Sequence, residues 1–132
     1  MPLELGGSGV GATPSWLLRA GLSSCAAASI ILAAATEGIE LTALDVRVTG
    51  WLDVRGIHGI AGAQGEPASA GPGDIQHFVR ICAHGVSAER LRALVDKGTR
   101  RSPLPFAVLN ATPLAVHIDL DAALCRQTKS PA

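Results

Sequence analysis

The chain has 132 residues, of which 48% are hydrophobic, and its eleven basic residues balance eleven acidic ones. This length fits a single domain, which we expect to span residues 1–132, and so much apolar mass argues against disorder across most of the chain. With a neutral net charge, two Phe, two Trp and no Tyr, the chain lacks the features that bind nucleic acid or an anionic membrane surface, so neither partner is expected.

The N-terminal residues 1–12 are rich in glycine, and we expect them to form an arm or loop before the first helix. They contain no basic region followed by an apolar run, so no secretory signal is expected and the cytoplasm is the expected compartment. The uncharged stretch from Ala20 to Thr36 is slightly short and too rich in serine for a membrane span. A core helix explains it better.

Two helices are predicted before the first strand. Thr13 is a suitable N-cap and Pro14 suits the first helical position, so a short helix is expected to begin there. Gly21 is expected to break that helix, and a second helix capped by a serine would then run to about Glu37. This second helix is apolar on nearly all sides, which is typical of a helix buried at the centre of a domain or a dimer.

Alternating apolar residues predict two strands in the middle of the chain. The first runs from Leu44 to Val54, with a bulge or bend near Gly50, and the second runs from Ile75 to Ala83. Residues 56–73 between them contain six glycines and two prolines, which predicts a long irregular connection of the kind that can serve as a lid.

The rest of the chain predicts a helix, a last strand and a tail. Ser87 is a suitable cap for an amphipathic helix that runs to about Arg100, and Pro103 follows its end. A third alternating strand is predicted from Leu114 to Leu120, with a polar tail over 121–132. These elements predict an α+β domain in which a curved antiparallel sheet packs on two longer helices.

The three widely spaced cysteines, Cys25, Cys82 and Cys125, fit neither a disulfide framework nor a metal motif. Reduced thiols are therefore expected, and no metal or cofactor site is assigned. If Ser23 or Ser24 caps the second helix, Cys25 lies in its first turn, where unpaired N–H groups and the helix dipole stabilise a thiolate. A cysteine among alanines is more often a small buried hydrophobe, and that interpretation stays open.

The glycine-rich stretch Gly6–Leu18, followed by Cys25 and by the turn Arg101-Ser102-Pro103, resembles the OsmC/Ohr family of thiol-dependent hydroperoxide reductases. The expected order of elements from about Gly6 to Leu120 is similar as well. The resemblance implies that Cys25 is the peroxidatic nucleophile and that a small organic hydroperoxide is its substrate in oxidative-stress defence. It also implies an intertwined homodimer with active sites at the subunit interface.

The sequence departs from the family pattern in two places. Peroxidase members carry a second cysteine before the proline that ends the second long helix, and Ser102, which cannot form the resolving disulfide, stands there. Members also place strands with an arginine and an acidic partner before the glycines, where this sequence has only Met1–Leu5. We therefore expect one-cysteine chemistry, in which an external thiol reduces the Cys25 sulfenic acid. Cys82 and Cys125 stay open as resolving partners.

A non-catalytic homologue is the alternative. Its interface pocket would bind an apolar small molecule, or serve only dimerisation, with Cys25 as a packed thiol. The serine at residue 102 and the short segment before the glycines favour this interpretation.

Overall fold

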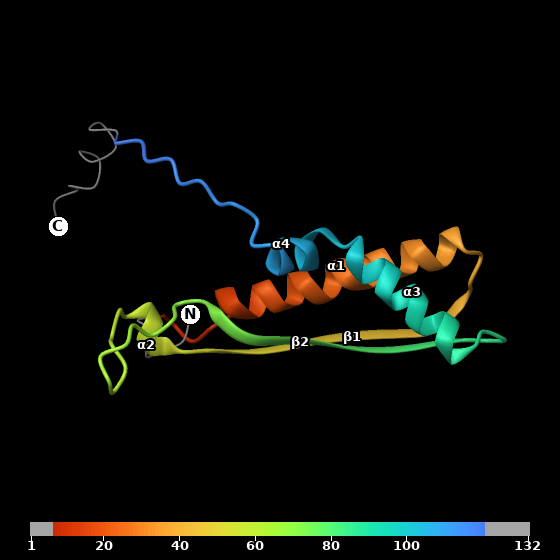
Figure 1. Cartoon of the computed structure of the whole chain (residues 1–132), viewed down its shortest axis with the longest axis horizontal. Coiled ribbons are helices and arrows are strands. Elements are labelled where there is room, and N and C mark those ends of the chain that lie inside the picture. Colours follow the sequence, from red (N-terminus) through yellow and green to blue (C-terminus); the bar gives the residue numbers. More distant parts are fainter. Residues whose placement is uncertain (1–6, 121–132) are drawn as a thin grey trace.

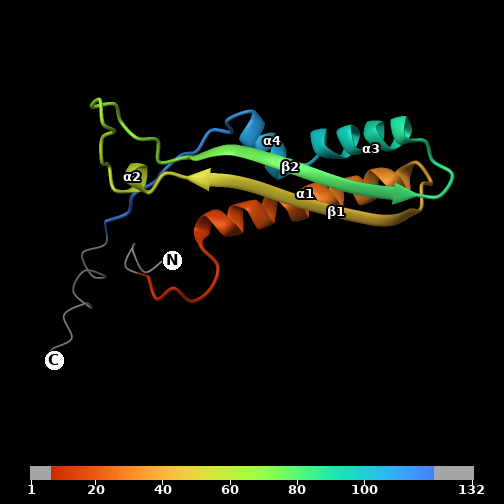
Figure 2. The ribbon, with the colours of Figure 1, turned by 90° about the horizontal axis from the view of Figure 1, so that it is seen from below.

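The computed structural model of the chain describes residues 7–120. Its elements follow in the order α1 (Pro14–Thr36), β1 (Leu41–Leu52), α2 (Val54–Ile57), β2 (Pro72–Ala83), α3 (Ala88–Arg100) and α4 (Pro103–Leu109). The two strands form a long antiparallel ribbon, and α1, α3 and α4 lie on one of its faces (Figures 1 and 2). The predicted α+β class with an antiparallel sheet is therefore confirmed.

The first helical segment is one continuous helix, so the prediction of two helices separated at Gly21 was wrong. The predicted start is confirmed, because the Thr13 Oγ1 accepts a hydrogen bond of 3.1 Å from the Trp16 N–H. A glycine inside a helix costs only about 1 kcal/mol relative to alanine, which packing offsets. At Gly21 the helix approaches α4, where an added Cβ would lie 3.3 Å from Leu104 Cδ1.

The ribbon pairs β1 with β2 in a register that matches Leu44 with Ile81 and Val48 with His77. The bulge predicted near Gly50 is confirmed by a register shift between Thr49 and Trp51. Alternate residues of both strands are half-buried and the others are exposed, as expected for a sheet with helices on one face.

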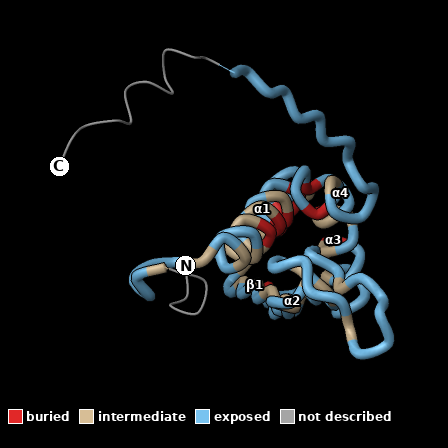
Figure 3. The backbone as a smooth tube through the Cα atoms, turned by 90° about the vertical axis from the view of Figure 1, so that its left-hand side faces the viewer, coloured by how far each residue is buried: buried red, intermediate tan, exposed pale blue. Residues whose placement is uncertain are grey.

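The third predicted strand is absent from the described residues. Residues 113–120 pair with no other strand there, and Leu114, Val116, Ile118 and Leu120 are between 76% and 89% exposed. The segment leads away from the helices and the ribbon (Figures 1 and 3). Alternation gives a segment two faces, but a strand forms only when its backbone groups find a partner. The predicted tail over 121–132 and the first six residues of the arm lie outside the described residues.

The core is centred on one face of α1 (Figure 3). Its buried residues recur every three or four positions, which places them on one side of a helix; they are Leu22, Ala26, Ile30, Ala33 and Ala34. Leu94 of α3 completes this layer. Among the described residues, α1 is also the one helix whose length and composition would suit a membrane span. Here the helix packs on β1, α3 and α4 instead.

Candidate functional site

Cys25 lies in the middle of α1, so the expectation that it occupies the first turn of a helix was wrong. The unpaired N–H groups of α1 lie near Pro14, roughly 15 Å away along the axis at about 1.5 Å per residue. The field of a helix end fades within its first turn. Thiolate stabilisation by the helix terminus therefore does not apply to Cys25.

A hydroxyl group contacts the sulfur instead. Ser102 Oγ donates a hydrogen bond to Cys25 Sγ across 3.1 Å. Ser102 is 0% exposed, whereas Cys25 is half-buried. Ser102 stands at the N-cap position of α4, but its side chain makes no capping bond to that helix. The hydroxyl is thus directed at the sulfur, and the residue for which the sequence resemblance implies a second cysteine in peroxidase members lies beside Cys25.

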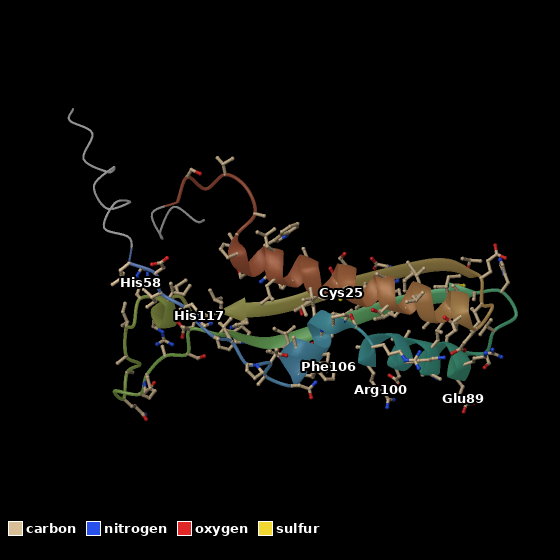
Figure 4. All side chains as sticks on the ribbon, turned by 90° about the horizontal axis from the view of Figure 1, so that it is seen from above. Cys25, His58, Glu89, Arg100, Phe106 and His117 are labelled. Carbon is tan, nitrogen blue, oxygen red and sulfur yellow. The ribbon has the colours of Figure 1, made fainter. Side chains whose placement is uncertain are left out.

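Two close helix contacts on either side of Cys25 bring the serine to it. Before Cys25, Gly21 lets α4 approach through Leu104. After Cys25, α3 crosses α1 at Gly98, where an added Cβ would lie 2.8 Å from the Ile30 Cα. The chain turns from α3 into α4 between these two contacts. The turn therefore lies over Cys25, near the centre of the molecule in Figure 4.

Sequence reasoning had interpreted Gly21 as a helix break and had not singled out Gly98. Both are glycines inside helical patterns. Such glycines cost helix stability and usually have a packing reason. The presence of glycines at these two helical positions could therefore have indicated the close helix contacts that build the site.

The ion pairs of the described residues lie away from the sulfur. Lys97 Nζ lies 2.7 Å from Glu37 Oε1, and Arg90 approaches the same carboxylate to 3.9 Å, at the C-terminal end of α1. The hydrogen bond from Lys97 holds the pKa of Glu37 below its ordinary value. Arg55 pairs with Asp53 at the end of β1, and its hydrogen bonds lower the pKa of Asp53.

The other cysteines do not complete a disulfide within residues 7–120. Cys25 and Cys82 are both free thiols, and Cys82 is exposed. Cys82 alternates with the residues of β2 that face the helices, so it lies on the opposite side of the ribbon from α1. It is therefore not placed to resolve Cys25 in the same chain. Cys125 lies outside the described residues.

An apolar groove of about 610 Å³ lies at the N-terminal end of α1, beside α2. Its walls are mostly aliphatic, and its one titratable side chain is that of His58; the wall residues include Pro14, Leu18, Leu52, Val54 and Ile57. His58 lies at the α2 end of the molecule, apart from Cys25 (Figure 4). The predicted irregular connection thus contributes to a groove, which the sequence pattern had not located.

Comparisons with known proteins agree with the fold. The family model described as OsmC-like protein matches residues 6–117. Solved structures with a similar fold include an OsmC-like protein from Mycoplasma pneumoniae, with 21% identity and a TM-score of 0.63 over 78% of this chain and 66% of that protein. An organic hydroperoxide resistance protein OsmC from Legionella pneumophila shares 23% identity, with a TM-score of 0.55 over 82% of this chain and 69% of that protein.

A third similar structure is an organic hydroperoxide resistance protein from Elizabethkingia anophelis with thiocyanate bound. It shares 20% identity, with a TM-score of 0.55 over 82% of this chain and 69% of that protein. The chain thus matches about two thirds of these proteins' own length, from 66% to 69%. At these identities the likeness shows the fold. No curated protein sequence gives a significant match.

Proposed function

The chain belongs to the OsmC-like protein family, and from this premise we propose that it is a thiol-dependent peroxidase that reduces small organic hydroperoxides in oxidative-stress defence. Cys25 is its nucleophile. The observation that carries the proposal is the hydrogen bond from the buried Ser102 hydroxyl to the sulfur of the half-buried Cys25. Two similar structures are described as organic hydroperoxide resistance proteins, which supports the substrate class.

The first half of the reaction is a displacement at oxygen. The Cys25 thiolate attacks the outer oxygen of ROOH, an S–O bond forms and the O–O bond breaks. The leaving alkoxide takes a proton and departs as the alcohol ROH, while Cys25 becomes a sulfenic acid. The sulfur is oxidised by two electrons and the peroxide is reduced by two.

The second half requires an external thiol. Ser102 occupies the place beside Cys25 where an internal resolving thiol would stand, and Cys82 lies on the far side of the ribbon. A first R′SH therefore displaces water from the sulfenic acid to give a mixed disulfide. A second R′SH then releases the Cys25 thiol and R′SSR′. A reducing compartment such as the cytoplasm supplies such thiols, and we place the protein there.

The same proposal includes a homodimer. Large apolar side chains of α1 and α4 are exposed in the single chain, among them Trp16, Leu32 and Phe106. Residues 113–120 add an alternating apolar face without a partner strand in residues 7–120. A second copy would cover these surfaces, since a two-stranded ribbon alone is marginally stable in water.

A second candidate function is the binding of an apolar small molecule without catalysis. The groove beside α2 favours it, because its walls are aliphatic and its volume of about 610 Å³ suits a small ligand. In that case Cys25 is a packed thiol, and the groove rather than the sulfur is the functional site.

Peroxide consumption by the purified protein separates the two candidates. Wild type and Cys25→Ser are each supplied with cumene hydroperoxide and either dithiothreitol or a monothiol. Turnover by wild type that is lost in the variant supports the peroxidase. If neither protein consumes the peroxide with either reductant, the result would favour the binding function.

A further inference from the structure

We propose that Ser102 is a positioning residue whose buried hydroxyl bonds to the Cys25 sulfur and increases its reactivity toward an electrophile. The inference deepens the peroxidase proposal and rests on it for the role of Cys25. It assigns to Ser102 a task of its own at the position where other members carry a second sulfur.

The hydrogen bond favours the anion over the neutral thiol. Hydrogen bonds to a charged acceptor are roughly twice as strong as those between neutral groups. The Ser102 hydroxyl donates to Cys25 Sγ across 3.1 Å from a position that is 0% exposed, so water competes little for the donor. It also makes no capping bond to α4, which leaves the sulfur as its acceptor. Removing this donor therefore costs the thiolate more than the thiol.

Few other charges act on the sulfur from the elements around it. Arg100 and Arg101, next to Ser102 in the chain, are exposed, and Arg100 points away from α1 in Figure 4. His77 lies on the helix-facing side of β2, and burial lowers its pKa, so the ring is neutral near pH 7. Arg19 of α1 precedes Cys25 by six residues, a spacing that places the two on different faces of the helix. Ser102 is thus the polar group that contacts the sulfur within residues 7–120.

The hydroxyl approaches the sulfur from the buried turn between α3 and α4, and Cys25 itself is half-buried. The hydrogen bond therefore fixes one side of the sulfur, and a reactant has to approach it from another side.

Alkylation by iodoacetamide across the pH range tests the inference. The rate at Cys25 is followed by mass spectrometry of the peptide that carries it, in wild type, Ser102→Ala and Ser23→Ala. Ser23 is the matched control, since its hydroxyl bonds to the Ala20 carbonyl in the same helix and does not contact the sulfur. Circular dichroism confirms that each variant is folded.

For Ser102→Ala we expect the alkylation rate at Cys25 near pH 7 to fall several-fold, because the hydrogen bond that favours the anion is lost. The plateau rate at alkaline pH stays at the wild-type value, because every sulfur is then a thiolate. Ser23→Ala should react at the wild-type rate at every pH. An unchanged rate near pH 7 in Ser102→Ala, or an equal fall in Ser23→Ala, would overturn the inference. Because alkylation needs no peroxide, slower alkylation of Ser102→Ala in a protein without peroxide turnover would contradict the peroxidase and keep the role of Ser102.

Discussion

Gly98 of α3 lies against Ile30 of α1 so closely that a Cβ at residue 98 would come 2.8 Å from the Ile30 Cα and 3.0 Å from its nitrogen. Backbone atoms in the middle of a packed helix cannot move aside as the end of a side chain can. The contact therefore sets how near α3 comes to α1. The turn that follows α3 brings Ser102 to Cys25, so this glycine also determines the geometry of the site.

Gly98→Ala should destabilise the protein by about 1 to 3 kcal/mol, the usual cost of overpacking a core. Alanine is the better helix former, so helix propensity alone would predict the opposite sign. Urea unfolding measures the difference. Gly21→Ala is the control, because its Cβ meets only the flexible end of Leu104 at 3.3 Å. Equal stability of the two variants would show that the α1–α3 contact is not tight.

Ser102→Cys should form a disulfide with Cys25 under mild oxidation. The Ser102 oxygen lies 3.1 Å from the sulfur, so a small adjustment brings two sulfurs to the bonding distance of about 2.05 Å. Mass spectrometry of non-reduced peptides detects the bond. Ser24→Cys, which places a thiol on the exposed side of α1, should leave Cys25 unpaired within the chain. A Ser102→Cys protein with two free thiols after oxidation would contradict the observed geometry.

The ion pair between Glu37 and Lys97 should make the protein less stable as pH falls below the pKa of glutamate. Its hydrogen bond lowers the pKa of Glu37 in the folded state. The contribution of the pair to stability is therefore complete above the pKa of glutamate in the unfolded chain, about 4.3. It is lost as pH falls through the lower pKa of Glu37 in the folded state. The free energies of unfolding of wild type and Glu37→Gln, measured in urea, should differ at pH 7 and become equal near pH 3.

Glu40→Gln is the control for this pH dependence. Glu40 is exposed and forms no salt bridge in the described part of the chain, so its substitution should leave the urea midpoint nearly unchanged at pH 7. Since the side chains of the Glu37–Lys97 pair are partly exposed to solvent, the expected difference is small. A difference in unfolding free energy between wild type and Glu37→Gln that grows as pH falls would contradict the assigned direction of the pH dependence.

The homodimer predicts a mass in solution of twice 13.5 kDa by light scattering. Ile118→Asp places a charge on the alternating apolar face of residues 113–120 and should shift the protein toward the monomer. His117→Asp places the same charge on the opposite face and should leave the dimer intact. A wild-type protein that is monomeric at every concentration would contradict the dimer, and equal behaviour of the two variants would exclude this segment from the interface.

Local chemistry predicted much of the fold. Thr13 and Ser87 cap α1 and α3 as expected, because capping depends on a hydroxyl and a few neighbouring N–H groups. The period of two predicted both strands of the ribbon and the bulge near Gly50. These features depend on residues that are close in sequence, which is why one sequence is sufficient to find them.

Features set by tertiary contacts were missed. Gly21 has the local signature of a break, but packing against α4 keeps α1 continuous. Residues 114–120 have the pattern of a strand, yet they pair with no strand within residues 7–120. The resemblance indicated both Cys25 and Ser102, but the family pattern could not show that a serine hydroxyl would bond to the sulfur. That contact depends on how two glycines let three helices meet.

The most direct test of the central claim is the chemical state of Cys25 after exposure to one equivalent of cumene hydroperoxide. Peptide mass spectrometry with dimedone, which traps sulfenic acids, identifies the oxidised residue. We expect the dimedone adduct at Cys25, absent from the exposed Cys82 and abolished when a monothiol is added before the trap. Peroxide that leaves Cys25 unmodified, or that oxidises Cys82 first, would contradict the assignment of Cys25 as the peroxidatic nucleophile.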